Sequence, residues 1–174
     1  LQDQRASLRT ANERLQAAEK DARRLALVAK RTDNAVVLTS PTGHIEWVND
    51  GFVRLTGYTL DEAGGKRPGD LLQGPRTDLA TVQHMSQRLR NGEGFSVELI
   101  NYSKTGREYW LAIEVQPIRD ASGQIVNFMA IEADITARKD GERRLAMQYE
   151  TSRILAAGGT MDAILPRLLA CVGT

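Results

Sequence analysis

Residues 43–58, GHIEWVNDGFVRLTGY, decide how this chain folds. Polar and apolar side chains alternate from 44 to 48, which is the period of a half-buried strand. Together with the β-branched run at 35–39 and the turn residues 40–43, they predict a β-hairpin. Asn49 then stands where its side chain can cap a short helix, and Gly57 can end that helix. The expected start of the domain is therefore a hairpin that leads directly into a short helix.

The sequence beyond Gly57 predicts further helices and then a sheet. Thr59 and Glu62 have the spacing of a capping box, which opens a second short helix. A longer helix is expected from about Thr77 to Arg90, and its inner face carries Val82, Met85 and Leu89. Alternating patterns then predict three strands, at 95–102, 108–118 and 125–135. Strands and helices in this order favour an α+β fold with an antiparallel sheet and helices on one face.

Both ends of the chain have a helical composition. Residues 1–31 contain no glycine or proline, and an apolar seam repeats every seven residues at Leu1, Leu8, Leu15 and Ala22. This pattern favours a parallel two-stranded coiled coil, with a helix packed on its own domain as the alternative. A second charged helix is expected from Thr136 to about 155. The apolar helical pattern after Gly159 is interpreted as the beginning of a further domain, and the chain as a fragment of a longer protein.

Composition excludes several classes of function. A formal net charge of +1 gives no overall reason to expect nucleic-acid binding. The single cysteine, Cys171, makes no intrachain disulfide and no cysteine-based zinc site, which suits a cytoplasmic protein. No apolar run approaches the ~18–20 residues that span a bilayer. Because the sequence offers no nucleophile–base pair, metal cluster or phosphate loop, we expect no catalytic and no metal-binding residues in this fragment.

The motifs at 43–52, 55–58, 65–68, 72–75, 104–106 and 134–136 resemble the PAS superfamily with its C-terminal PAC motif. The resemblance implies a PAS fold, in which a five-stranded antiparallel sheet carries short helices on one face. It places the PAS domain at 27–137, with the PAC motif at about 95–137. Coiled-coil-like helices at 1–26 and 138–157 flank it, and residues 158–174 look like the start of a truncated GAF domain.

Two stretches of the sequence also resemble the light-sensing LOV branch of this superfamily. The resemblance implies that Gln73 and Asn101 would be hydrogen-bond partners of a flavin, with Trp110 as a further pocket candidate. Glu132 occupies the position of that branch's signalling glutamine. Leu111 replaces its second flavin-binding asparagine. The segment 66–70, KRPGD, stands where the branch has its reactive cysteine, so thiol adduct chemistry is not expected from this segment.

Three cofactor interpretations remain open from the sequence. The favoured one is no cofactor, because two polar flavin partners and the cysteine are replaced. A noncovalent flavin, FMN or FAD, comes next. Haem comes last, with His84 as candidate axial ligand on the long helix.

The expected function is that of a sensory, relay and dimerisation module in a multidomain bacterial-type signalling protein, a histidine kinase or a cyclic-dinucleotide enzyme. The alternative is a flavin- or haem-binding redox or gas sensor without LOV photochemistry. The family resemblance makes Asp134 and Thr136 the hinge candidates between the sheet and the output helix. We expect a homodimer formed through the two flanking helices, an effector domain in the same chain, and neither nucleic acid nor membrane as a partner of this fragment.

Overall fold

A computed structural model of the chain describes residues 33–156. The chain divides into two compact units, Leu1–Ala133 and Asp134–Thr174, which are described separately below. The N-terminal helix predicted at 1–26 and the GAF-like segment predicted at 158–174 lie outside the described residues. None of the helices in the described part is long and apolar enough to cross a membrane.

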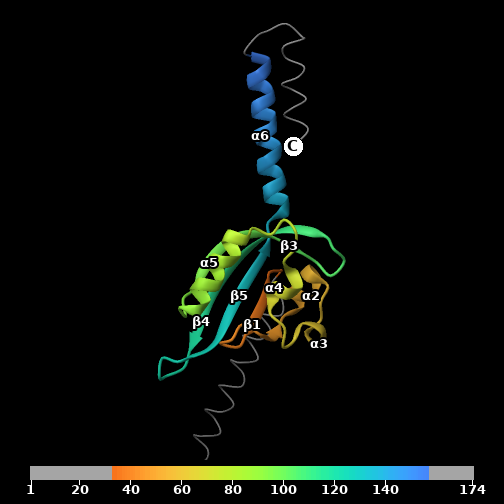
Figure 1. Cartoon of the computed structure of the whole chain (residues 1–174). Coiled ribbons are helices and arrows are strands. Elements are labelled where there is room, and N and C mark those ends of the chain that lie inside the picture. Colours follow the sequence, from red (N-terminus) through yellow and green to blue (C-terminus); the bar gives the residue numbers. More distant parts are fainter. Residues whose placement is uncertain (1–32, 157–174) are drawn as a thin grey trace, which may run out of the picture. The chain divides into compact units, whose positions relative to one another are not determined.

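The first unit is built on a five-stranded antiparallel sheet, as predicted. The strand order is β2-β1-β5-β4-β3, so β5 is the central strand (Figure 1). The strands are β1 (Ala35–Thr39), β2 (Ile45–Val48), β3 (Phe95–Tyr102), β4 (Glu108–Arg119) and β5 (Ile125–Asp134). The first and last strands of the sequence therefore pair with each other, with Ala35 opposite Glu132 and Val37 opposite Ala130.

The hairpin of β1 and β2 leads into helix α2 (Asp50–Thr56), as the opening motif predicts. Asn49 is the N-cap, and its Oδ1 accepts hydrogen bonds from Phe52 N at 2.9 Å and Val36 N at 2.8 Å. Its Nδ2 donates to the carbonyl oxygen of Asn34 at 3.0 Å. Gly57 ends the helix with φ of 79°, in the left-handed region that favours glycine. One buried side chain thus ties the beginning of β1 to the beginning of α2.

Three more helices follow before β3. In α3 (Leu60–Ala63), the predicted capping box is present, since the Glu62 carboxylate accepts from Thr59 N at 3.1 Å. Helix α4 (Pro68–Leu72) was not predicted, although proline at its first position is a known start signal. Helix α5 (Leu79–Arg90) begins two residues later than predicted, because Asp78 is its N-cap and accepts from Thr81 N at 2.8 Å.

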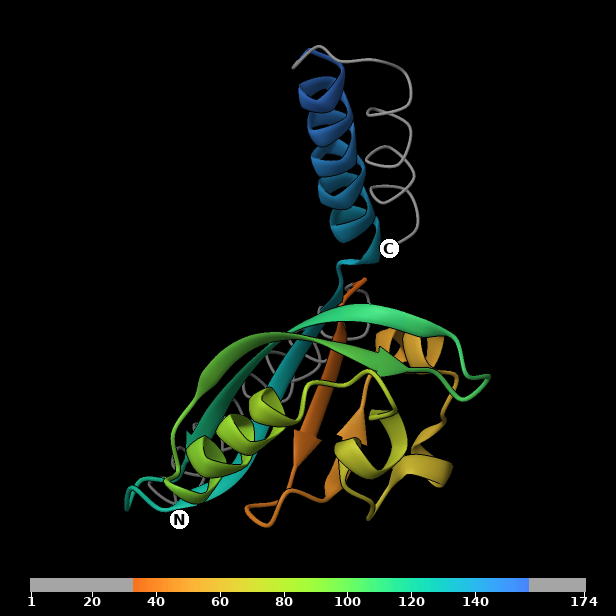
Figure 2. The same ribbon diagram turned by 45° about the horizontal axis from the view of Figure 1, so that its top comes forward.

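All four helices lie on one side of the sheet, with α5 along the strands (Figure 2), α2 beside β1, α3 beside β2 and α4 beside β3. One group of buried apolar residues lies beneath α2–α4 and includes Val37, Ile45, Phe52 and Leu72. A second lies between α5 and the β3–β4 hairpin and includes Leu99, Tyr109, Leu111 and Phe128. The core is therefore formed in two halves.

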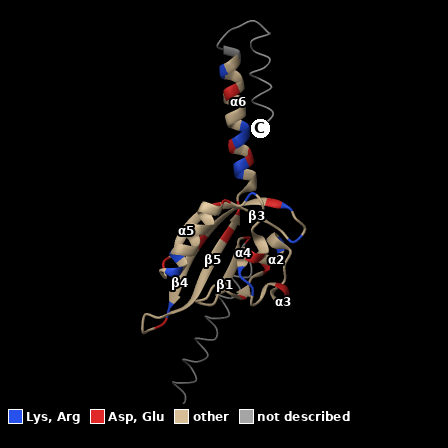
Figure 3. Ribbon diagram, viewed as in Figure 1, with Lys and Arg blue, Asp and Glu red and all other residues tan. Residues whose placement is uncertain are grey.

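The second unit contains helix α6 (Thr136–Ala156), in agreement with the helix predicted from Thr136. Arg138 forms an ion pair with Glu142 at 2.7 Å, and Arg153 forms one with Glu150 at 2.5 Å. Positive and negative side chains follow one another along this helix (Figure 3). Such exposed pairs add a few tenths of a kcal/mol each, about 0.2–0.5 kcal/mol, and keep the helix stable and solvated.

Candidate ligand site on the inner face of the sheet

Alternation along the strands separates an inner face, which packs against α2–α5, from an outer face. On β3 and β4 the inner positions are the odd-numbered ones, and the register pairs Asn101 with Tyr109 and Leu99 with Leu111. On β5 the inner positions include Phe128, Ala130 and Glu132, because Phe128 and Ala130 pack in the core beneath the helices. The inner face therefore carries the polar groups of Asn101, Tyr109 and Glu132 among apolar side chains.

Asn101 and Glu132 are both buried and both incompletely bonded. Their side chains are 4 % and 3 % exposed. Within residues 33–156, neither Asn101 Oδ1 nor Glu132 Oε2 has a hydrogen-bond partner. A buried polar atom without a partner costs about 1–3 kcal/mol, so natural proteins rarely retain one without a reason. Two on the same face of one sheet indicate a surface that is completed by a bound molecule.

Burial also changes the acid–base chemistry of the site. Loss of hydration raises the pKa of the Glu132 carboxyl from its ordinary value of 4.5 to about 7. No ion pair or hydrogen bond contributes to this change. Near neutral pH, a substantial fraction of Glu132 is therefore the neutral acid, which can donate as well as accept a hydrogen bond.

The helix that covers this face is packed loosely against it. Helix α5 has no buried residue, and its inward side chains Val82, Met85 and Leu89 are all partly exposed. Ala130, in the middle of the central strand, is also partly exposed, although it contacts both halves of the core. A central inner-face position is normally fully covered in a close-packed domain. The covering of the sheet is therefore incomplete at Ala130, where the two halves of the core meet.

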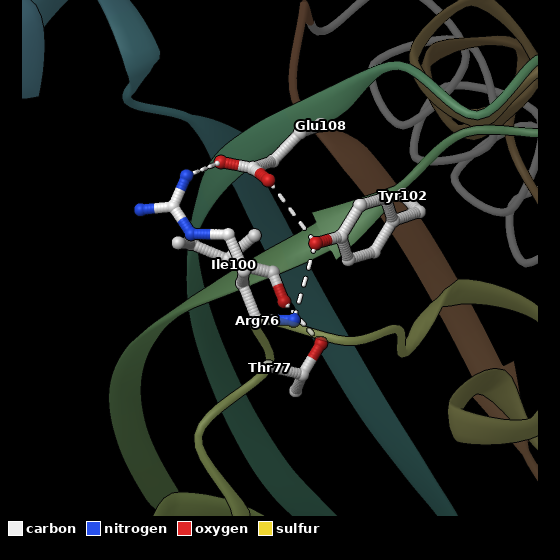
Figure 4. Close-up of polar contacts among 5 residues, drawn as sticks. All are labelled: Arg76, Thr77, Ile100, Tyr102 and Glu108. Carbon is white, nitrogen blue, oxygen red and sulfur yellow. Dashed lines mark hydrogen bonds and ion pairs between the residues drawn. The ribbon is translucent and has the colours of Figure 1, made fainter.

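The loop between α4 and α5 is fixed to the edge of the sheet by a group of polar contacts (Figure 4). Thr77 Oγ1 donates to the carbonyl oxygen of Ile100 at 2.7 Å and accepts from Gly74 N at 2.9 Å. The Tyr102 hydroxyl accepts from Arg76 N at 3.2 Å and donates to Glu108 Oε2 at 3.1 Å. The loop that follows Gln73 is thus held on β3, next to Asn101.

Glu108 completes this group from β4. Its Oε1 forms an ion pair with Arg76 Nη1 at 2.6 Å, although the Arg76 side chain is 65 % exposed. The Tyr102 ring lies on Gly74 so closely that a Cβ atom there would be 2.3 Å from a ring carbon. Gly74 therefore has to remain glycine for the loop to approach the strand. The sequence analysis did not predict that Thr77 and Tyr102 hold this loop on β3. The turn residues Gly-Pro-Arg-Thr at 74–77 were the only local indication of an ordered loop there.

The structure brings two of the predicted pocket residues together on one face and places the others elsewhere. Gln73 is exposed at the end of α4, where its side-chain amide lies against Gly69. Trp110 is half-buried on the outer face, because it alternates with the inner residues Tyr109 and Leu111. His84 is exposed on α5, on the side opposite to Val82, Met85 and Leu89. The position of His84 therefore does not favour its candidacy as an axial haem ligand.

Asp134 and Thr136, the predicted hinge residues, are in direct contact. Asp134 Oδ1 accepts a hydrogen bond from Thr136 N at 2.9 Å, where α6 begins. The boundary between the two compact units falls between Ala133 and Asp134. Asp134 therefore ends the last strand and stabilises the start of α6.

A family model described as PAS domain matches residues 33–137. This chain belongs to the PAS domain family. The match spans both halves of the core and the start of α6. It agrees with the fold class predicted from the opening motif and the three C-terminal strands.

Curated relatives of this PAS domain include phototropins and a blue-light-activated histidine kinase. Phototropin-2 of Oryza sativa subsp. japonica is 36 % identical over 122 residues, which are 67 % of this chain and 13 % of the relative. A blue-light-activated histidine kinase of Brucella abortus (strain 2308) is 32 % identical over 118 residues, which are 65 % of this chain and 24 % of the relative. The chain thus spans a small part of these relatives.

Solved structures with the same fold are light-oxygen-voltage domains. One, reported as "Flavin Analogue Sheds Light on Light-Oxygen-Voltage Domain Mechanism", superposes with a TM-score of 0.58 at 29 % identity and covers 67 % of this chain and 88 % of that one. The light state of the aureochrome1 LOV domain gives 0.56 at 28 % identity, covering 66 % of this chain and 96 % of that one. An RNA-binding light-oxygen-voltage receptor gives 0.65 at 21 % identity, covering 74 % and 37 %, and shows the fold alone.

These relatives correct one sequence-based expectation. The absence of a cofactor was the favoured interpretation, and that preference is wrong. Phototropins, a light-activated histidine kinase and solved LOV domains all point to a flavin chromophore in this group of PAS domains. The expectation gave too much weight to the replaced positions and too little to the polar groups that remain, Asn101 and Glu132.

Proposed function

We propose that this PAS domain is a sensory module that binds a flavin noncovalently between the inner face of the sheet and helix α5. The observation that supports it most directly is the pair of buried side chains Asn101 and Glu132. Each has an atom that finds no partner within the described residues. The relatives supply the class of ligand, and the unsatisfied atoms supply a place where a planar ring with donors and acceptors fits.

Different residues of the inner face would make the polar and the apolar contacts with the flavin. Asn101 and a neutral Glu132 would hydrogen-bond the polar edge of the ring, because both can donate and accept. Leu99 and Leu111, which are paired across β3 and β4, would contact its apolar surface. Helix α5 would exclude water by packing Val82 and Met85 over the ring. A bound flavin supplies light absorption and reversible electron transfer, which the protein side chains do not.

We propose that sensing here does not use a thiol adduct in the α4 region. Residues 65–74 contain no cysteine, and the single cysteine of the sequence is Cys171. Bonding of a protein side chain to the ring through sulfur would need a nearby thiol. In place of a thiol adduct, the signal would be a change in the redox or protonation state of the bound flavin ring, or the binding and release of the flavin.

The output in this proposal passes through the start of α6 to a second copy of the chain. Asp134 and Thr136 form the connection, and two large apolar side chains of α6, Leu145 and Tyr149, are 68 % and 72 % exposed one turn apart. An exposed apolar pair between charged positions suits a helix–helix contact in a dimer. The effector would be a domain of the same protein, such as a histidine kinase or a cyclic-dinucleotide enzyme.

Flavin binding can be tested with a variant that should weaken binding without destabilising the fold. Purified full-length chain is titrated with FMN, following flavin fluorescence, for the wild type and Asn101→Leu. We expect the variant to lose at least about fivefold in affinity, since one buried hydrogen bond contributes about 1 kcal/mol or more. Its stability without flavin should be equal to or higher than that of the wild type, because the substitution removes an unsatisfied buried amide.

Asn91→Leu is the matched control, because Asn91 is exposed at the end of α5. It makes the same chemical change away from the proposed site, so both affinity and stability should stay near the wild-type values. Equal FMN affinity in the wild type and Asn101→Leu would remove Asn101 from the site. A wild-type chain that binds neither FMN, FAD nor riboflavin would refute the proposed function.

A further inference from the structure

Glu132 is an unusual residue for the place that it occupies. It lies on β5, the central strand, with β1 and β4 on either side. Its side chain is 3 % exposed, and its neighbour across β1 is Ala35, which is completely buried. A carboxylate in such a position is deprived of water on all sides and has no counter-charge in the described contacts. Burial of this kind strongly favours the neutral acid.

The charged groups of the surrounding elements do not offset this burial. Helices α2, α3 and α4 carry Asp50, Arg54, Asp61 and Asp70, all of which are exposed. On α5, Arg90 is exposed, and Arg88 is paired with Glu93 at 2.9 Å. The half-exposed Glu62 of α3 is paired with Lys104. Strand β1 presents Ala35 and Val37, and the inner positions of β4 include two ionisable side chains, the buried Tyr109 and the exposed Arg119, which donates to Gly92 O and Gly123 O at the far end of the strand.

We propose that Glu132 acts as a neutral hydrogen-bond donor that determines which ligands the site accepts, so that ligand binding is coupled to a proton on this carboxyl. The inference rests on the proposed function. A neutral carboxyl offers one O–H donor, whereas a carboxylate can only accept. Asn101 Oδ1, which likewise has no hydrogen-bond partner within residues 33–156, is an acceptor. Together they select a planar ring with an acceptor at one polar position and an N–H donor at another.

The coupling has a defined sign. If the neutral acid is the form that binds, affinity is constant at pH values below the pKa of Glu132. Burial places that pKa at about 7. Above it, the fraction of protein with a neutral Glu132, which is the form that binds, decreases. The apparent dissociation constant then rises by about tenfold for each pH unit. A ligand that accepts a hydrogen bond from Glu132 stabilises the neutral form further, so occupancy and protonation reinforce each other.

The inference is tested by titrating the full-length chain with FMN at several pH values between about 5.5 and 9. The wild type should bind with constant affinity up to about pH 7 and lose about tenfold per pH unit above it. Glu132→Gln keeps a donor that does not ionise, so its affinity should not change with pH. Glu132→Leu, which has no donor, should bind weakly at every pH. Glu114→Gln, an exposed position on the outer face of β4, should keep the wild-type pH dependence.

A second measurement follows the carboxyl itself without any ligand. The infrared C=O stretch of a buried neutral acid should be present in the wild type at about pH 6, disappear with a midpoint near 7, and be absent from Glu132→Gln. Two outcomes would overturn the proposed role of Glu132 while leaving the flavin-binding proposal intact. One is equal FMN affinity of the wild type at pH 5.5 and 8.5, and the other is a pH dependence in Glu132→Gln equal to that of the wild type. Loss of FMN binding in all variants and at all pH values would instead overturn the proposed function, and the ligand role of Glu132 with it.

Discussion

Ala35 and Glu132 face each other across β1 and β5, and a completely buried methyl group is thus paired with a buried carboxyl. The pair joins the first residue of the first strand to a residue two positions before Asp134, at which α6 is connected. A change in the ionisation of Glu132 therefore occurs opposite the first residue of β1 and two positions before Asp134.

The stability of the domain should depend on pH through Glu132. Because burial raises its pKa from 4.5 to about 7, the folded state binds more protons than the unfolded state in that window. The free energy of unfolding should therefore fall as pH rises from 4.5 to about 7, by about 3 kcal/mol, and remain low above it. Urea denaturation at several pH values measures this slope. Glu132→Gln should lack it, whereas Glu114→Gln should retain it, and equal slopes in all three proteins would contradict the assignment.

Asn49→Ala should destabilise the domain by about 2–4 kcal/mol. The buried amide accepts from Val36 N and Phe52 N and donates to Asn34 O, and the substitution leaves these backbone groups without their partner. Thermal unfolding compared with Asn91→Ala gives the measurement. That exposed control should stay within about 0.5 kcal/mol of the wild type. A loss below about 1 kcal/mol in Asn49→Ala would show that water or a shifted side chain replaces the amide.

Thr77→Val should loosen the loop between α4 and α5 without unfolding the sheet. The substitution keeps the shape of the side chain but removes the hydroxyl that binds Ile100 O and Gly74 N. We expect a loss of about 1–3 kcal/mol and faster hydrogen exchange at Gly74. Thr105→Val, in the exposed turn before β4, serves as the control. Unchanged exchange at Gly74 would mean that the backbone bond of Thr77 N to Gly74 O holds the turn by itself.

Asp134→Ala should weaken the start of α6 and leave the sheet intact. The carboxylate accepts from Thr136 N in a solvent-exposed contact, so the domain should lose less than about 1 kcal/mol. Exchange of the Thr136 amide should become faster, while the amides of β4 keep their protection. Asp140→Ala changes an exposed carboxylate further along the helix and provides the comparison. The hinge assignment fails if the full-length protein still responds normally to its signal in Asp134→Ala.

The proposed dimer contact predicts that Leu145→Glu shifts the chain toward the monomer. A charge at an exposed apolar position of α6 would be buried without a partner in a helix–helix interface. Ala146→Glu adds the same charge at the next, also exposed, position and should affect association less. Light scattering during size-exclusion chromatography measures both. Identical masses for the wild type, Leu145→Glu and Ala146→Glu would place any contact elsewhere.

The sequence could predict those features that depend on neighbouring residues. Asn49 as a cap, Gly57 as a helix end and the Thr59–Glu62 capping box all involve groups within four positions of each other, and the structure contains all three. Helix α4 escaped prediction because a five-residue helix with Gly69 inside has little periodicity to detect. The start of α5 was placed too early because Thr77 is held by Ile100, which lies 23 positions away.

The site was harder to predict, because facing and burial depend on tertiary structure. Asn101 and Trp110 are close in sequence on neighbouring strands, and the register places them on opposite faces. That register depends on the turn at 103–106, whose geometry the residue types alone leave open. The incomplete bonding of Asn101 and Glu132 is a property of the packed sheet. For this reason the sequence could nominate these residues but could not show that they leave a binding surface unsatisfied.

Helix α5 begins at its Asp78 cap, and Arg88 in its last turn donates two hydrogen bonds to Gly94 O. Met85 and Leu89 pack against the buried cluster of β3 and β4 without being fully buried, and Val82 is also partly exposed, so changing them costs less than changing a fully buried side chain. Substitutions at Val82 or Met85 would therefore be tolerated by the fold while they reshape the surface above the sheet. If these side chains cover the proposed flavin site, single mutations can change its ligand preference over evolutionary time, without stabilising mutations being acquired first elsewhere.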